Sequence, residues 1–291
     1  MDTRRYLALE TIVKRGNMTK AAEELGYTQS ALSQMIGSLE SEMGFRILNR
    51  SRSGCELTLE GKRLYPLVEK VLSADQALNE RAAEINGLES GTVRMGTVAS
   101  VSAHWLPPPI REFEQKHPHV QFIIHQGDYS LIPEWIKQGK VDFGFINPLC
   151  GTTLKAEPLK TAPMSAVLPK DHRLANLPTI PLADLAKEPF ILLEEGNYSE
   201  PLEAFRTAGL SPNIKYTIHD DYSIMSMVEQ GLGISIMADL IMKKCPYELV
   251  KRPTEPPVLR TMALVYENES KLPIASKRFI ELVREHKDDL P

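Results

Sequence analysis

Residues 18–34 read MTKAAEELGYTQSALSQ, a stretch in which a glycine separates two helical patterns. The small and apolar residues of the first pattern share one side: Ala21, Ala22 and Leu25. Asn17 or Thr19 can cap its start, because a short polar side chain accepts a hydrogen bond from a free backbone amide there. Gly26 ends it, since glycine takes the left-handed conformation without a steric penalty. A second helix begins near Thr28, so the stretch predicts two helices joined at a tight corner.

The second helix continues as QSALSQMIGSLESEMG, with apolar residues at spacings of three and four: Leu32, Met35, Ile36 and Leu39. Small and amide residues fall on the opposite face: Gln29, Ser30, Ser33, Gln34 and Gly37. Such a face lets a helix enter the major groove, where Gln pairs with adenine edges and Ser reaches bases or phosphates. A merely solvated face is the alternative. The helix-turn-helix spacing of Ala22, Gly26 and Ile36 favours DNA binding.

The segment GFRILNRSRSGCELTLEG, residues 44–61, predicts a two-stranded wing after the second helix. Arg46, Arg50 and Arg52 surround its Ser/Gly-rich tip. Arginines in that position suit phosphates or a narrow minor groove, and a solubilising charge cluster is the alternative.

The charge distribution agrees with a DNA-binding start. The whole chain has a net charge of -4, with 34 Lys+Arg and 38 Asp+Glu. Residues 1–63 contain ten of these basic residues and eight of these acidic residues, and the rest contains 24 and 30. The N-terminal segment is therefore the expected contact with an anionic polymer, and its affinity should fall steeply with salt.

Residues 7–61 closely resemble the N-terminal winged helix-turn-helix of LysR-type transcriptional regulators, through TKAAEEL, TQSALSQ, SLESEMG, ILNR and LTLEG. The chain departs from the family at Ser30, where proline is common, and at Leu48, where phenylalanine is common. The resemblance implies a DNA-binding domain at residues 1–58. By position it places Gln29, Ser30, Ser33 and Gln34 in the groove, and Lys20, Arg50 and Arg52 on the DNA backbone.

A long helix is expected at residues 59–90, capped by Thr58 and containing Pro66, which should bend it or mark its first turns. Apolar residues recur along it at spacings typical of a short coiled coil: Leu64, Leu67, Val71, Ala74, Leu78 and Ile85. The stripe could pack on its own domain, but little sequence precedes it. A dimer-forming linker is therefore favoured, and the resemblance implies a homodimer or homotetramer.

Residues 91–291 alternate short apolar runs with helical patterns, which predicts an α/β domain of two similar halves. They resemble the effector domain of the same family, which looks like a two-lobed periplasmic solute-binding protein. This implies a first lobe at about 91–160 plus 265–291 and a second at about 161–264. The expected fold is α/β with an N-terminal winged helix-turn-helix domain, a linker helix and a two-lobed effector domain.

Such a fold binds its ligand between the lobes, at strand ends and helix starts. The expected effector-binding residues lie in those loops: Ser100, Ser102, His104, Gly127, Asn147 and Ser199. Serines without an acidic cluster in residues 97–104 favour a small anion such as a carboxylate metabolite. The alternative is an apolar or aromatic effector against Trp105, Phe145 and Tyr198. Any single serine could instead cap only its own helix.

Other functional classes lack their signals. Adjacent Glu194 and Glu195 read as loop charges rather than an acid/base pair, and GLG at 231–233 does not match a dinucleotide-binding motif. The three cysteines are widely spaced, so no metal site or cofactor is expected. A secreted solute receptor would need an export signal, and an enzyme would need a catalytic constellation. The sequence predicts a cytoplasmic, non-enzymatic regulator that binds double-stranded DNA and an effector, without membrane association.

Overall fold

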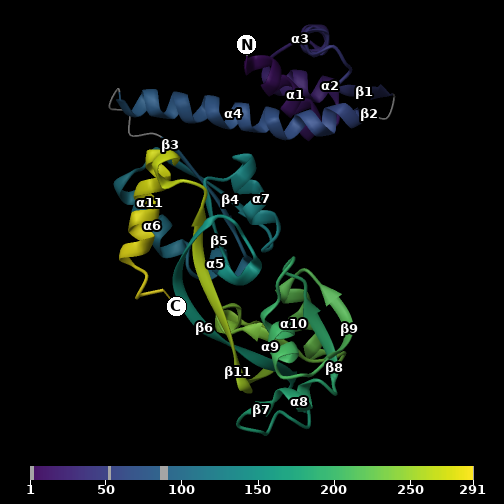
Figure 1. Ribbon diagram of the computed structural model, residues 1–291, viewed down its shortest axis with the longest axis vertical. Helices are drawn as coiled ribbons and strands as arrows, with labels where there is room; N and C mark the ends of the chain where they lie inside the picture. Colours follow the sequence, from purple (N-terminus) through teal and green to yellow (C-terminus); the bar gives the residue numbers. More distant parts are fainter. Residues whose placement is uncertain (1–2, 52–53, 86–90, 291) are drawn as a thin grey trace. The chain divides into compact units, whose positions relative to one another are not determined.

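The computed structural model describes residues 3–51, 54–85 and 91–290 and contains two compact units (Figure 1). The first unit holds the elements up to the long helix α4, and the second holds the elements from β3 to α11. Among the described helices, none is both long and apolar enough to cross a lipid bilayer.

The first unit is a helix-turn-helix with a wing. Its helices are α1 (Thr3–Arg15), α2 (Met18–Leu25), α3 (Gln29–Met43) and α4 (Leu59–Ile85), and its strands are β1 (Leu48–Ser51) and β2 (Gly54–Leu57). The strands pair antiparallel from Leu48 opposite Leu57 to Ser51 opposite Gly54. The core is fully buried and draws on both helices of the corner: Leu9, Ile12, Ala21, Leu32, Ile36 and Leu39. The predicted helix-turn-helix and wing are confirmed.

Local capping explains where the helices begin and end. Asn17, one of the two candidate caps, accepts hydrogen bonds from the amides of Thr19 and Lys20 at 2.9 and 3.1 Å. Gly26 has a φ of 70°, the left-handed conformation that turns the chain toward α3. Thr28 accepts from the Ala31 amide, so α3 starts at Gln29 without a proline. Thr58 accepts from the Gly61 amide and caps α4.

The second unit is built on a seven-stranded mixed sheet with the order β10-β6-β11-β5-β3-β4, with β7 paired to β11. Its strands are β3 (Gly91–Thr97), β4 (Val120–Gln126), β5 (Phe143–Ile146), β6 (Lys155–Pro169), β7 (Ile180–Pro181), β10 (Ser235–Ala238) and β11 (Leu249–Tyr266). A separate parallel pair consists of β8 (Pro189–Leu193) and β9 (Asn213–Ile218). The helices are α5 (Ala99–His104), α6 (Pro107–Lys116), α7 (Leu131–Gln138), α8 (Leu182–Leu185), α9 (Glu200–Thr207), α10 (Asp221–Glu229) and α11 (Ile274–Glu285), with short 3-10 turns η1 (Pro148–Cys150), η2 (Ile241–Lys244) and η3 (Glu269–Lys271).

The second unit has two lobes connected by the long strands β6 and β11, which pair antiparallel along most of their length (Figure 1). We call the part with β3–β5, α5–α7 and α11 the first lobe, and the part with β7–β10 and α8–α10 the second lobe. Each lobe has its own apolar core: one surrounds Phe143 and Phe279, and the other includes Phe190 and Phe205. The two-lobed architecture expected from the sequence is confirmed.

Candidate nucleic-acid interface and ligand cleft

The open face of α3 carries the residues predicted to read DNA. Gln29, Ser30 and Gln34 are exposed and Ser33 is half-buried. The apolar side of the same helix is sealed in the core by Leu32 and Ile36. The amide groups of Gln29 and Gln34 are therefore available to an approaching duplex.

The side chains of Arg50 and Glu40 form hydrogen bonds between the wing and α3. Arg50 of β1 donates from Nη1 to Ser33 Oγ at 2.7 Å, so a predicted backbone contact and a predicted groove residue lie together. Glu40 Oε1 accepts from the amides of Ile47 and Leu48 at 2.8 and 3.1 Å and fixes the start of the wing. Lys20 is exposed on α2. The predicted contact at Arg52 lies outside the described residues.

In the second unit, the buried side chain of Arg260 on β11 lies between the two lobes. Its Nη2 donates to Glu195 Oε1 of the second lobe at 2.7 Å. Its Nε donates to the hydroxyl of Tyr129 at 2.7 Å, and its Nη1 donates to Ser100 Oγ at 3.3 Å, both in the first lobe. A single guanidinium therefore holds side chains from both lobes.

Glu200 extends this network from the first turn of α9. Its Oε1 accepts from the Tyr129 hydroxyl at 3.0 Å and from Asn147 Nδ2 at 2.8 Å. Asn147 is placed by its own backbone, because its Oδ1 accepts from the Leu149 amide. The backbone joins the lobes at the same place, where the amide of Tyr129 donates to the carbonyl of Glu195 at 3.0 Å. We call Ser100, Tyr129, Asn147, Glu195, Glu200 and Arg260 the cleft cluster.

The cleft cluster includes two of the six predicted effector residues, Ser100 and Asn147. Ser102 instead donates to the Ala99 carbonyl and accepts from Gln126. Ser199 Oγ accepts from the Leu202 amide and caps α9, which is the alternative role expected above for any single serine.

The other two predicted residues also lie outside the hydrogen-bond network. A Cβ atom at Gly127 would come within 2.5 Å of the Trp135 ring, so this glycine permits close packing. His104 is half-buried with its pKa lowered by burial and by the nearby Lys244 and Lys243.

Little free space remains beside Arg260. A cavity of about 20 Å³, enough for one water molecule, is lined by residues that include Ser100, Trp105, Arg260 and Met262. Of the aromatic residues named in the alternative hypothesis, Trp105 lines this cavity and Phe145 is fully buried in the first-lobe core. Tyr198 lines a separate, more open hollow of about 330 Å³ together with Glu200. An effector at Arg260 would therefore need to open the lobes or displace part of the cleft cluster.

Sequence reasoning missed Arg260 and Glu200, and it read Glu195 as a loop charge. Glu194 does fit that reading, because its exposed carboxylate lies 3.3 Å from His219. Glu195, the next residue, is buried against Arg260. The usable signal for Glu195 was its place two residues after an apolar strand, at the end where such folds bind ligands.

Burial controls the electrostatics of the cleft cluster. Removal from water raises the pKa of Glu195 to about 8, because desolvation outweighs the attraction of Arg260 and because Glu200 adds further repulsion. A protonated Glu195 can still accept the hydrogen bond from Arg260 through its carbonyl oxygen. Among the residues that the structure describes, no group of three or more His, Cys, Asp or Glu side chains is arranged to hold a metal.

These two units define a class of protein, a DNA-binding regulator with a two-lobed ligand-binding part. Residues 86–288 match the family model described as LysR substrate binding domain, and residues 3–62 match the one described as bacterial regulatory helix-turn-helix protein, lysR family. The chain belongs to the LysR family of transcriptional regulators, as its N-terminal resemblance implied.

Known proteins resemble the chain over nearly its whole length. It is 33% identical over 279 residues to the uncharacterized HTH-type transcriptional regulator YvbU of Bacillus subtilis (strain 168), with 94% of both chains covered. It is 27% identical to the transcriptional dual regulator GltC of the same organism, covering 97% of this chain and 96% of GltC. Full-length CbnR complexed with its target DNA has the same fold, with a TM-score of 0.74, 20% identity and coverage of 98% and 99%. HinK of Pseudomonas aeruginosa has a TM-score of 0.62, 24% identity and coverage of 98% of both chains.

The raised pKa of Glu195 predicts how stability depends on pH. The folded state holds a proton at Glu195 up to about pH 8, whereas the unfolded chain releases it near the ordinary value. The free energy of unfolding should therefore fall as pH rises from about 4.5 to about 8, by at most ~1.4 kcal/mol per pH unit from this group. Glu195→Gln should flatten this decline in thermal melts, whereas Glu194→Gln should preserve it. Equal pH slopes in the native protein and in Glu195→Gln would contradict the assignment.

Proposed function

We propose that this LysR-type regulator binds a small effector between the lobes of its second unit, at Arg260. The observation that carries the proposal is the set of hydrogen bonds from one buried guanidinium to Ser100 and Tyr129 in one lobe and Glu195 in the other. A ligand that enters this network changes contacts to both lobes at once. Its differential affinity for two lobe arrangements is what can shift the regulator between states.

The effector carries a carboxylate that takes the place of Glu195 on Arg260. Arginine binds carboxylates through charge-assisted hydrogen bonds, and Glu195 Oε1 already accepts one such bond from Arg260 Nη2 at 2.7 Å. The glutamate therefore acts as an internal substitute for the ligand in the closed cleft. The proposed pocket is centred on Arg260 and includes Ser100 and Asn147 of the six residues expected from the sequence.

The DNA-binding part comprises residues 1–58, and residues 59–90 form the linker to the effector domain at 91–291. Gln29, Ser30, Ser33 and Gln34 face the bases, while Lys20, Arg50 and Arg52 contact phosphates. The protein acts in the cytoplasm as a regulator rather than as an enzyme. The exposed polar face of α3 supports the base-reading role, and the bond between Arg50 and Ser33 places the wing beside that face.

Two copies of the chain pair through α4. Leu64 of the predicted stripe packs on its own domain, whereas Leu67, Val71, Ala74 and Leu78 are exposed at spacings of four, three and four. An exposed apolar stripe with this periodicity is typical of a helix that lacks its coiled-coil partner. The side chain of Ile85 lies outside the described residues. The expected assembly is a homodimer, or a homotetramer if the second units also pair.

The assignment of base and phosphate contacts predicts that two variants lose DNA affinity in different ways. Gln34→Ala should relax sequence preference at a cost of about 1–3 kcal/mol on the preferred site, because it removes a base contact. Arg50→Ala should weaken all sequences alike and lower the salt dependence, because it removes a phosphate contact. Mobility shifts with DNA flanking the gene, at several salt concentrations, measure both effects. Gln115→Ala, at an exposed position of α6, is the control. Unchanged binding by both variants would reject the groove assignment.

The dimer assignment predicts that Leu78→Glu lowers the molecular mass in solution, because a charge would enter the apolar seam. Leu78 and Leu149 are each 68% exposed, so Leu149→Glu is a matched control on the second unit. Light scattering should show dissociation for the first variant and the native mass for the second. A native chain that is already a stable monomer would refute the proposal.

The effector assignment predicts that small carboxylates stabilise the full-length protein in a thermal-shift screen. Saturation at 100 times the Kd should add about 2.7 kcal/mol to the free energy of unfolding. Arg260→Met should lose this response, whereas Arg252→Met, on the same strand but outside the cleft cluster, should keep it. If Arg260→Met does not fold, Ser100→Ala should still weaken binding. Undiminished affinity in both cleft variants would end the proposal.

A further inference from the structure

Two buried carboxylates in the cleft cluster share one guanidinium. The side chains of Arg260, Glu195 and Glu200 are 7%, 10% and 2% exposed. Glu195 Oε1 lies 2.7 Å from Arg260 Nη2, and Glu200 Oε1 lies 3.6 Å from Arg260 Nε. The second oxygen of Glu200, Oε2, is buried and has no hydrogen-bond partner among the described residues. The cluster therefore contains an acceptor that still lacks a donor.

Of the described neighbours of Glu195 and Arg260, two are acidic and one lysine already donates elsewhere. Asp221 and Asp128 lie near Glu195 and disfavour its ionised form further. Lys160 lines the cavity beside Arg260, but its ammonium donates to the backbone carbonyl of Leu290. A buried carboxylate without a cationic partner is costly, and a proton on Glu195 relieves part of that cost. A cationic hydrogen-bond donor would supply both the donor that Glu200 Oε2 lacks and a positive charge beside the two glutamates.

A simple carboxylate would worsen this imbalance. If it replaced Glu195 on Arg260, Glu195 would lose its cationic partner, and Glu200 Oε2 would still lack a donor. An ammonium group has three N–H donors and one positive charge, and it can donate to the free Oε2 of Glu200 and to the released Glu195. Glu195 and Glu200 contact neighbouring nitrogens of one guanidinium, at 2.7 Å from Nη2 and 3.6 Å from Nε, so an ammonium that enters beside Glu200 lies in the same cluster as Glu195.

We propose that the effector is an amino acid, or a compound with the same pair of charges. Its carboxylate binds Arg260 and Ser100 in place of Glu195, and its ammonium binds between Glu195 and Glu200. The inference rests on the proposed effector site and adds the class of ligand. It also assigns Glu200 as the residue that distinguishes an amino acid from a simple acid.

Calorimetric titration of the full-length protein tests this class directly. The probes are the proteinogenic amino acids, each beside its deaminated acid and its decarboxylated amine. At least one amino acid should bind about 10- to 100-fold more tightly than either matched compound, as expected for charge-assisted hydrogen bonds that the truncated compounds cannot make. Equal affinity of the acid would overturn this inference and leave the Arg260 proposal standing. Equal affinity of the amine would overturn both, because Arg260 would then contribute nothing.

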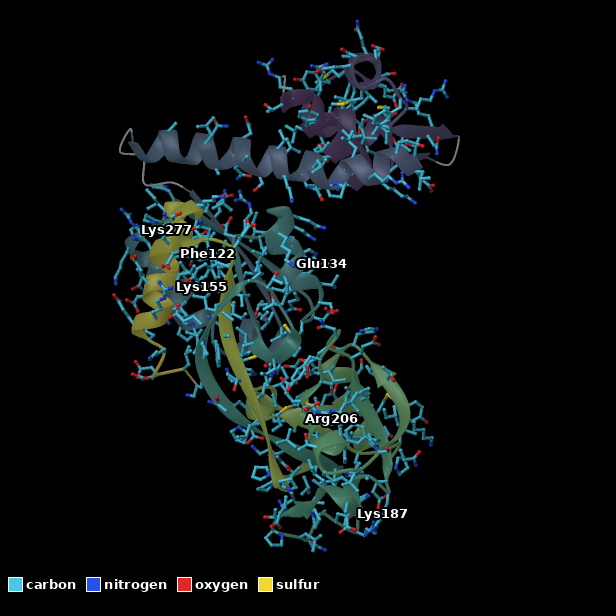
Figure 2. The ribbon with its side chains drawn as sticks, in the orientation of Figure 1. Phe122, Glu134, Lys155, Lys187, Arg206 and Lys277 are labelled. Atoms are coloured by element: carbon cyan, nitrogen blue, oxygen red, sulfur yellow. The ribbon has the colours of Figure 1, made fainter. Side chains whose placement is uncertain are left out.

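A matched pair of variants locates the ammonium site. Glu200→Gln should reduce the preference for the amino acid over its deaminated acid by about tenfold or more, because it removes the charge and keeps the shape. Glu203→Gln is the control on the same helix, since Glu203 instead pairs with Arg206, labelled in Figure 2. A full amino-acid preference in Glu200→Gln would overturn the assignment, as would the absence of binding by every amino acid.

Discussion

The hydrogen bonds of Arg260 are the interaction on which the arrangement of the second unit depends. The arginine lies on β11, one of the two strands that run through both lobes, and it reaches Tyr129 on one side and Glu195 on the other. Removal of one partner from a buried ion pair is costly because the other charge stays desolvated. The lobes are therefore joined by polar groups that a suitable ligand can replace, beside the apolar contacts of Leu240 and Tyr198 with the first-lobe core.

The DNA-binding unit could be predicted in detail because its signals are local. The caps at Asn17 and Thr28, the left-handed Gly26 and the apolar spacing of α3 all act within a few residues of one another. Each of these signals is a property of the backbone that short sequence patterns report directly. The hydrogen bond between Arg50 and Ser33, by contrast, needed the fold, since it joins a strand and a helix 17 residues apart.

The cleft could be predicted only in outline, for the same physical reason. Arg260 and Ser100 are 160 residues apart in sequence, and Arg260 and Glu195 are 65 apart. The serine loops could be predicted because the start of a helix has a recognisable sequence pattern. The same pattern also selected serines that only cap their own helix, such as Ser199. No comparable local sequence pattern indicates a ligand contact for Arg260 on β11 or for Glu200 at the first position of α9. Their function follows from burial, which the sequence alone did not reveal.

The charge balance of the cleft constrains how this regulator can respond. A ligand that only adds contacts to Arg260 has little space, since the cavity beside this arginine is about the size of one water molecule. Binding must therefore exchange one set of ion pairs for another, and the net gain is the difference between them. Such an exchange is selective, because a ligand that satisfies Arg260 but leaves Glu200 unpaired recovers only part of the lost energy. The same exchange alters what joins the two lobes, so recognition of the ligand and the change in lobe arrangement are a single event.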